Sequence, residues 1–363
     1  MQKRVLAMVM VATVVFSACT KSTSPEDTVP QPTDEIAQDF ESDPTAENMA
    51  TQCSSGLPID GGKLRVVTSI APITSLVGQM VAGTGIIVEG VIPESANSHT
   101  YELTPADIAK ISKADIIIAN GLGMEKNFGS ASQTSMKEGA TYCELATAAI
   151  DKSNYAYDLT FPEAGGFPNP HVWLNPAMGL RYLNSIRDAV TARTTDGRES
   201  IDENYVKLSQ QMMALDKAMD TAVGTIPVRN KVIYTFHNSL PYFASHFKFD
   251  TGLVFQPPAF ADPTPVEIAD AIALMRNEKA PALIANTEFP GAFLDEVATG
   301  AGVKIITISD ENLPGEPGQA DHTWGARLRQ DFISIVEGLG GDAAAVKAVK
   351  AGIGVKDTAD YPQ

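Results

Sequence analysis

Histidine is scarce in this chain of 363 residues, and the places where it occurs are the first indication of chemistry. The five histidines are far apart in the sequence: His99, His171, His237, His246 and His322. A lone histidine is most often a packed or surface residue, so the residue type alone indicates little. The context is more informative, because His237 directly follows the apolar run Val232–Phe236 and Asp310 follows the apolar run Lys304–Ile308.

Side chains just beyond the carboxyl ends of parallel strands line the crevice where α/β proteins bind ligands. His99 lies in a loop after a third apolar run, residues 86–92, and His171 lies in the proline-rich loop Pro168–Trp173. Three imidazoles and the carboxylate of Asp310 are donors that suit Zn²⁺, Mn²⁺ or Fe²⁺. The candidate metal ligands are therefore His99, His171, His237 and Asp310.

Two other classes of protein compete with a metal-binding protein. A secreted zinc hydrolase would hold its zinc with three protein ligands and an open water position, whereas a fourth protein ligand closes the site here. The sequence also has no HExxH motif, no recognisable Ser–His–Asp arrangement and no cysteine cluster for a thiolate site. A surface adhesin is the third possibility, although no adhesive module is recognisable. We therefore expect no enzymatic activity.

The elements that must position the candidate ligands alternate between strand and helix. Strands are predicted at Leu64–Ile70, Ile86–Ile92, Asp115–Ala119, Lys231–Phe236, Gly252–Phe255, Ala282–Ala285 and Lys304–Ile308. Helices are predicted to begin near Pro72, Thr104, Ser239, Thr264 and Pro290, and a last helix covers residues 324–338. This alternation predicts an α/β fold with mainly parallel sheets covered by helices.

Two segments of the chain repeat each other and indicate two related lobes. Thr104–Ala109 (TPADIA) and Thr264–Ala269 (TPVEIA) both begin with Thr-Pro, which is typical of an N-cap and a first helical residue. Each helix is followed by an apolar strand that ends in Ala-Asn, at Asn120 and Asn286. The shared order of elements favours duplication of a lobe over chance.

One long helix is expected to join the lobes. Apolar side chains recur at spacings of three and four: Ile201, Tyr205, Leu208, Met212, Leu215, Met219 and Val223. They lie along one helix face, which we expect to dock on both lobes. A single continuous helix makes a stiffer connection than several extended crossings.

The first 18 residues are typical of an export signal. Lys3 and Arg4 precede the apolar run Val5–Phe16, which is too short to span a bilayer comfortably. Phe16-Ser-Ala-Cys19 resembles a bacterial lipobox, in which the cysteine is lipidated, although phenylalanine is atypical at its position. Cys19 is therefore expected to carry the lipid; the alternative is an ordinary secretory signal with an incidental cysteine.

Residues 19–56 are predicted to form a disordered acidic tether. Eight acidic residues face a single lysine, and four prolines interrupt any regular pattern. With so few large apolar residues, burial cannot offset the entropy cost of ordering. Cys53 and Cys143 remain beyond the lipidation site, and outside the cell they are a possible disulfide; the alternative is two free thiols.

The charge of the chain excludes one class of partner. The formal net charge is −17 and the isoelectric point is near 4.7. Such a surface repels nucleic acid, so we expect no DNA or RNA partner. The expected organisation is an export signal, a tether, an N-terminal lobe, a linker helix and a C-terminal lobe at residues 1–18, 19–56, 57–195, 196–224 and 225–363.

Five motifs, in the same order as in a known family, add to this interpretation. They are Ser98–Glu102 (SHTYE), Asn120–Glu125 (NGLGME), Pro170–Pro176 (PHVWLNP), His237–Phe243 (HNSLPYF) and Ser309–Leu313 (SDENL). Together they resemble the zinc and manganese substrate-binding lipoproteins of bacterial ABC importers, also called the metal-receptor or adhesin lipoproteins. The resemblance covers about residues 63–340.

The resemblance implies a structure and a function. The structure is two α/β lobes joined by one backbone helix, with His99 and His171 of the first lobe and His237 and Asp310 of the second holding the metal. The function is that of an exported, monomeric lipoprotein anchored to the outer face of the bacterial cytoplasmic membrane, at the cell surface or in the periplasm. It would capture Zn²⁺ or Mn²⁺ as a transported ligand and deliver it to the permease of an ABC importer with a cytoplasmic ATPase.

The same resemblance suggests roles for four further residues. Glu102 and Trp173 are candidates to orient or shield a ligand ring, and lobe-core packing is the alternative for Trp173. His246 and His322 have no ligand counterpart in the family. We expect His246 to be structural and His322 to lie on the surface.

Departures from the family pattern bear on the choice of metal. Asn169 and Asn175 replace aspartates and so remove charge beside His171. Residues 146–170 contain no histidine, whereas many zinc receptors carry a histidine-rich loop there. His237 argues the other way, because some manganese-receiving relatives have a glutamate there and a third imidazole favours a borderline metal. On balance we expect zinc rather than manganese.

Overall fold

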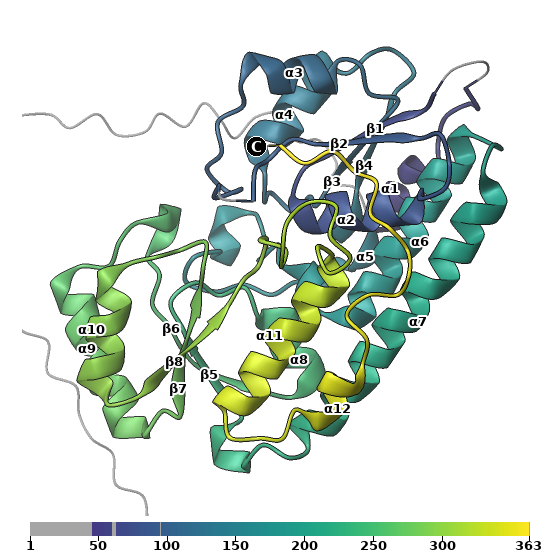
Figure 1. The fold of residues 1–363 in the computed structure, drawn as a ribbon. Coiled ribbons are helices and arrows are strands. Elements are labelled where there is room, and N and C mark those ends of the chain that lie inside the picture. The colour runs from purple at the N-terminus through teal and green to yellow at the C-terminus, as the bar shows by residue number, and fades with distance from the viewer. Residues whose placement is uncertain (1–45, 60–62, 95, 363) are drawn as a thin grey trace, which may run out of the picture. The chain divides into compact units, whose positions relative to one another are not determined.

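The computed structural model describes residues 46–59, 63–94 and 96–362. The export signal, the lipidation site Cys19 and most of the tether lie outside these residues. The described chain contains two four-stranded sheets, each with its own helices, and a long helix that runs along one side of both halves (Figure 1).

Every strand in both sheets is parallel to its neighbours. The first sheet has the order β2-β1-β3-β4, with β1 at Arg65–Thr68, β2 at Ile87–Gly90, β3 at Ile116–Ala119 and β4 at Thr141–Glu144. The second has the order β6-β5-β7-β8, with β5 at Val232–Thr235, β6 at Asp250–Val254, β7 at Ala282–Asn286 and β8 at Lys304–Ile308. Parallel strands need crossover connections, which here are largely helical. The predicted α/β class with parallel sheets is confirmed.

Helices connect the strands and pack around the two sheets. In the first half they are α1 (Ala46–Cys53), α2 (Ala71–Met80), α3 (Pro105–Ile111), α4 (Lys126–Ser135), α5 (Leu145–Ala149) and α6 (Pro176–Arg193). After α7 (Arg198–Val223) come α8 (Pro241–Phe247), α9 (Pro265–Glu278), α10 (Ala292–Ala301), α11 (Trp324–Gly338) and α12 (Ala344–Ala348). None of the helices in the described residues is both long and apolar enough to cross a membrane.

The two segments that repeat in sequence adopt the same local structure. Thr104 caps α3 and accepts a hydrogen bond from the backbone of Asp107, whose carboxylate accepts one in return. Thr264 and Glu267 form the same capping box at the start of α9. The strands that follow, β3 and β7, occupy equivalent positions in the two sheets.

Helix α7 is continuous over 26 residues and packs on both lobes. It contacts α2 and α6 of the first lobe and α8, α11 and α12 of the second. Six of the seven stripe residues are buried, and Tyr205 is partly buried. One hydrophobic core therefore extends from the first lobe through α7 to the second sheet, while a smaller core lies between that sheet and helices α9 and α10.

Part of the predicted tether is ordered. Residues 46–53 form α1, with Met49 and Cys53 buried, although residues 19–56 as a whole were expected to be disordered. Cys53 forms a disulfide with Cys143 in β4. The short helix is stable here because it packs against β4 and α5, which no local sequence pattern records.

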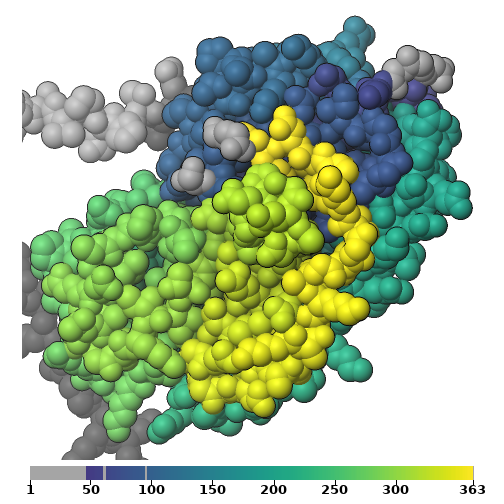
Figure 2. Space-filling model, in the orientation of Figure 1, coloured from purple at the N-terminus to yellow at the C-terminus, as the bar shows by residue number. Residues whose placement is uncertain are grey.

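The C-terminal segment returns to the first lobe, so the boundary 225–363 expected for the second lobe is wrong for its last residues. The backbone of Asp360 accepts from Gly90 (2.8 Å) and donates to Val88 (2.9 Å), which extends the edge of the first sheet at β2. Thr358 donates to the carbonyl of Gly78 (3.0 Å). Figure 2 shows this segment, in yellow, crossing the surface of the first lobe. The edge strand β2 offers unpaired backbone groups that the segment satisfies.

Candidate metal centre

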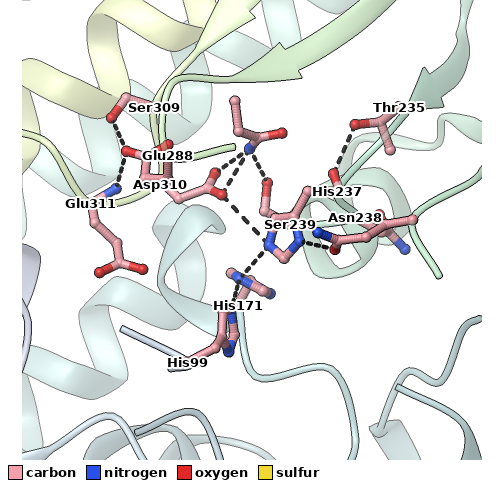
Figure 3. Close-up of polar contacts among 12 residues, drawn as sticks. His99, His171, Thr235, His237, Asn238, Ser239, Glu288, Ser309, Asp310 and Glu311 are labelled. Atoms are coloured by element: carbon pink, nitrogen blue, oxygen red, sulfur yellow. Dashed lines mark hydrogen bonds and ion pairs between the residues drawn. The ribbon is translucent and has the colours of Figure 1, made fainter. Parts of the chain in front are cut away.

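Four segments bring the candidate ligands together between the lobes (Figure 3). His99 follows β2 and His171 immediately precedes a short 3₁₀ turn at Val172–Leu174, both in the first lobe. His237 and Asp310 follow β5 and β8 in the second lobe. Three of the four therefore lie beyond the carboxyl ends of parallel strands, where α/β proteins bind their ligands.

The ring nitrogens converge on a small volume. Nε2 of His171 is 3.3 Å from Nε2 of His99 and 3.0 Å from Nε2 of His237. The Asp310 Oδ2 atom lies 3.8 Å from His237 Nε2. Each histidine offers one nitrogen to a cluster whose members all lie within 4.8 Å, and the described residues contain no other such cluster. All of these side chains are buried except His99, which is partly exposed.

Amide oxygens hold the second ring nitrogen of two histidines. His171 Nδ1 lies 2.8 Å from Asn169 Oδ1, and His237 Nδ1 lies 2.7 Å from Gln256 Oε1. An amide oxygen only accepts, so each Nδ1 carries the proton and each Nε2 presents a lone pair. Two lone pairs that face each other at 3.0 Å repel unless a cation lies between them.

Asn169 also connects the site to a carboxylate. Its amide nitrogen donates to Asp158 (2.9 Å) and to the carbonyl of Asn238 (2.6 Å), which sets the orientation of the amide. Asn238 in turn donates to the same carboxylate of Asp158 (2.9 Å). A negative charge therefore lies one hydrogen bond beyond Asn169 as seen from His171.

Asp310 is held by an asparagine at the end of β7. The Asn286 amide nitrogen lies 2.8 and 2.7 Å from the two carboxylate oxygens of Asp310 and 2.9 Å from Ser239 Oγ. Glu288 shapes the same loop, because its Oε1 accepts from the backbone of Glu311 (3.1 Å). These contacts direct the Asp310 carboxylate toward His237, as Figure 3 shows.

Asn120 has the equivalent place at the end of β3. Its amide nitrogen donates to the carbonyl of Pro170 (2.9 Å), the residue before His171, and its oxygen accepts from the hydroxyl of Tyr182 (2.7 Å). Both asparagines end a repeated sequence segment, which by itself indicates no role for them. The recurrence of Ala-Asn at the end of equivalent strands is the sequence signal that could have indicated their role.

Burial determines the charge of the metal-free ligands. It lowers the pKa of His237 to about 4 and holds the pKa values of His99 and His171 well below the usual 6.5. Burial, followed by the negative field of Glu288, raises the pKa of Asp310 well above its usual value. The imidazoles are therefore neutral, which is the form that binds a metal ion.

Three phenylalanines surround the histidines. Phe289 stacks on His237 (ring centroids 4.0 Å apart), Phe260 stacks on His99 (4.4 Å), and Phe161 lies edge-on to His171 (5.8 Å). Phe260 adopts a positive φ of 58°, an unusual backbone conformation for a bulky residue. Such an apolar shell limits access of water to a metal site.

The structure brings one of the two predicted supporting residues to the site. Trp173 is buried, its ring centroid lies 5.1 Å from that of His171, and its Nε1 donates to the carbonyl of Asp310 (2.9 Å). It therefore links the two lobes. Glu102 is exposed, and no hydrogen bond or ion pair joins it to a histidine of the cluster within the described residues.

The two remaining histidines lie outside the cluster. His246 pairs with Asp216 of α7 (2.6 Å) and is about one-third exposed. His322 is buried, with 1% of its side chain exposed, and its Nε2 lies 3.0 Å from Glu94. The expectation that His322 lies on the surface is therefore wrong, because its ring is enclosed between the lobes and faces Tyr361.

Two parallel α/β lobes, one connecting helix and an inward-facing histidine cluster define a class, the binding proteins that enclose a small solute between two lobes. The family model described as zinc-uptake complex component A, periplasmic, matches residues 66–338. The chain belongs to this family. It is thus an extracytoplasmic metal-binding component of an ABC importer and not an enzyme, which excludes the hydrolase alternative.

Individual proteins show the same relationship. Manganese-binding lipoprotein MntA of Halalkalibacterium halodurans is 25% identical over 285 residues, covering 78% of this chain and 91% of that protein. Manganese ABC transporter substrate-binding lipoprotein PsaA of Streptococcus pneumoniae is 24% identical over 291 residues, covering 79% and 93%. The solved periplasmic zinc binding protein TroA from Treponema pallidum shares the fold with a TM-score of 0.68 and 20% identity, covering 77% of this chain and 99% of that one.

Proposed function

We propose that this protein captures one divalent transition-metal ion between its lobes, with zinc as the preferred ion. The ligands are Nε2 of His99, His171 and His237 and a carboxylate oxygen of Asp310. The observation that carries the proposal is the convergence of Nε2 lone pairs at 3.0–3.3 Å, with the opposite nitrogens of two rings occupied by amide oxygens. A metal ion at the centre of this cluster would relieve the repulsion and bind all three nitrogens.

The donor set supports zinc over manganese. Three imidazoles and one carboxylate complete a four-coordinate site of the kind that Zn²⁺ prefers, whereas Mn²⁺ prefers more oxygen donors. Relatives are named for both metals: MntA and PsaA for manganese, and TroA for zinc. The affinity order of divalent metals also favours zinc at nearly any nitrogen-containing site, so a comparative test is needed.

Capture and delivery follow from the position of the site. Ligands from two lobes let the ion hold the lobes together, and parting the lobes releases it. Several relatives are named as ABC transporter substrate-binding lipoproteins, which supports a lipid anchor at Cys19 and delivery to a membrane permease. We propose that the protein does this as a monomer.

The first experiment tests the ligands one at a time. A ligand that binds only the folded protein stabilises it by about 2.7 kcal/mol when present at a hundred times its Kd, so zinc should raise the Tm of the native protein. His99→Ala, His171→Ala, His237→Ala and Asp310→Ala should each lose most of that rise. His246→Ala is the matched control and should keep it. A silent Asp310→Ala variant would remove this residue from the ligand set.

The second experiment tests the choice of metal at His237. Zn²⁺ and Mn²⁺ affinities are measured by competition for the native protein and for His237→Glu. Replacing an imidazole with a carboxylate should weaken zinc more than manganese and so narrow the gap between them. An unchanged gap would mean that residue 237 does not set the preference.

A further inference from the structure

A partly buried ion pair links the two loops that carry the candidate ligands, at a distance from those ligands. Glu94 belongs to the loop that leads from β2 to His99, and its Oε1 lies 3.0 Å from Nε2 of His322 in the second lobe. Its other oxygen accepts from the backbone of Leu313 (3.0 Å), three residues after Asp310. One carboxylate therefore ties the loop of a first-lobe ligand to the loop of a second-lobe ligand.

The surroundings of His322 favour its protonated form. Nδ1 lies 3.3 Å from the carbonyl of Pro314, and Nε2 lies 3.0 Å from the carboxylate of Glu94. Burial lowers the pKa of His322, but the hydrogen bond and charge of Glu94 outweigh it, with smaller contributions from Pro314 and Asp357, and the net pKa is raised. Tyr361, whose ring lies edge-on to the imidazole at 4.7 Å, donates its hydroxyl to Asp357 (2.5 Å).

A second contact between the same loops lies next to the ligands. Ser98, which precedes His99, donates to Oε1 of Glu311 (2.6 Å), which follows Asp310. Both side chains are buried. The two loops are therefore joined at two places without any metal ion.

We propose that the Glu94–His322 pair is a latch that positions the two ligand-bearing loops and so sets the affinity and release rate of the metal. This inference rests on the proposed function, because it assumes that the ligands of both lobes bind the ion together. A site completed by two lobes binds only in the fraction of molecules whose lobes are in register, and the apparent affinity falls with that fraction. The latch raises the fraction of molecules whose lobes are in register, although neither of its side chains contacts the metal.

The test uses His322→Phe and Glu94→Gln in the full-length protein. Phenylalanine keeps a ring against Tyr361 and removes both nitrogens, whereas glutamine keeps the size of Glu94 and removes its charge. Each should weaken zinc binding by roughly tenfold, in the usual range of coupling between sites, and should speed zinc loss to a chelator. The double variant should be no weaker than the single variants, since both remove one interaction.

Two readouts separate a latch from a ligand or a general loss of fold. The absorption spectrum of bound Co²⁺ should stay native in both variants, because all four ligands remain. Amide hydrogen exchange of the metal-free protein should become faster at Leu313, whose N–H donates to Glu94. His246→Phe is the matched control, since it also breaks a histidine–carboxylate pair (2.6 Å) but one on α7 and α8. It should bind zinc like the native protein.

Each contrary result has one meaning. Native zinc affinity together with native Leu313 exchange in both variants would overturn the latch. An altered Co²⁺ spectrum in His322→Phe would also overturn it, because His322 would then act at the metal. The exchange measurement uses the metal-free protein, so its result does not depend on the proposed function. The proposed function fails under either of two other results. In one, the native protein binds no metal; in the other, Asp310→Ala and the alanine variants of the three histidines all bind metal normally.

Discussion

The two lobes share one topology but are held together differently. Both edges of the first sheet are covered by segments distant in sequence: the disulfide Cys53–Cys143 attaches α1 at β4, and Asp360 pairs with β2. Among the described residues, no segment pairs its backbone with the outer edges of β6 or β8 in the second sheet. The first sheet therefore has a covalent tie at one edge and a backbone tie at the other, and the described part of the second sheet has neither.

The repeated asparagines also act differently. Asn286 donates to the carboxylate of Asp310 itself, whereas Asn120 donates to the backbone before His171 and accepts from the hydroxyl of Tyr182. The first lobe supplies imidazoles alone, and the second supplies an imidazole and a carboxylate. The two lobes share the same strand order but offer different candidate ligands, because different side chains follow equivalent strands.

The largest effect is expected from the disulfide, which only the first lobe has within the described residues. It closes a sequence separation of 90, and its removal in Cys53→Ala/Cys143→Ala should cost about 2–4 kcal/mol of unfolding free energy. The measurement is urea unfolding of the native protein and the double variant. Zinc affinity should stay near native, because no ligand is disturbed. A simultaneous loss of zinc affinity would show that the Cys53–Cys143 disulfide also shapes the metal site.

Substitution of Asn286 should mainly affect zinc affinity, whereas substitution of Asn120 should mainly affect the free energy of unfolding. Asn286→Leu removes the donor to Asp310 and should weaken zinc binding by about 10–100-fold. Asn120→Leu leaves the buried Tyr182 hydroxyl without its acceptor and should mainly reduce stability, by about 1–3 kcal/mol. Isothermal titration and urea unfolding of both variants test this. Equal losses of affinity would mean that the lobes use the asparagines alike.

The pH dependence of binding should reside in the second lobe. A raised pKa means that the metal-free Asp310 carboxyl holds a proton that the metal must displace, so affinity falls as pH falls through that pKa. Burial lowers the pKa of His237 to about 4 and lowers the pKa values of His99 and His171 well below the usual value, so the rings compete less for protons than ordinary histidines do. A fall centred on the ordinary histidine pKa near ~6.5, expected for unperturbed rings, is therefore not predicted.

Proton release on zinc binding, measured by calorimetry in buffers of different ionisation enthalpy, tests this assignment. The native protein should release up to about one proton from the carboxyl, which corresponds to as much as a tenfold change in affinity per pH unit. Asp310→Asn should release fewer protons and show a flatter profile. Identical release from both proteins would place the proton on a histidine instead.

The smallest effects are expected at the two capping boxes. Thr104→Ala and Thr264→Ala should each cost about 0.5–2 kcal/mol of stability. The loss at Thr104 should be larger, because Asp107 is buried and its carboxylate also accepts from the hydroxyl of Tyr101 (3.2 Å), whereas Glu267 is exposed. Thermal unfolding measures both, and zinc affinity should not change. The reverse order would mean that burial of the box does not matter.

Local signals in the sequence were enough to predict most of the frame. The apolar runs that became β1, β3, β5, β7 and β8 were recognisable, and so were the Thr-Pro helix starts and the stripe of α7. These patterns arise within a few residues, from the strand and helix periods and from capping. The three histidines that converge in the structure were recognisable from their places after apolar runs or in the proline-rich loop, and from the motifs around them.

Elements that depend on distant partners were missed. Strand β4 (Thr141–Glu144) is four residues long and has no apolar run, and α1 is a polar segment inside an acidic stretch. Each is stabilised by the other, through packing and through the Cys53–Cys143 disulfide. The pairing of Asp360 with β2 likewise has no local sequence pattern.

The sequence by itself determined most of the strands and helices, the Thr-Pro residues that begin two helices, and the side chains that are candidates to bind a metal. Only the tertiary structure decided which neighbours those side chains meet: Gln256 for His237, Asn286 for Asp310, and Glu94 for His322. The reason is physical. Secondary structure is specified by contacts close in sequence, whereas hydrogen bonds between loops, burial and the resulting pKa shifts depend on how two lobes pack across a helix of 26 residues.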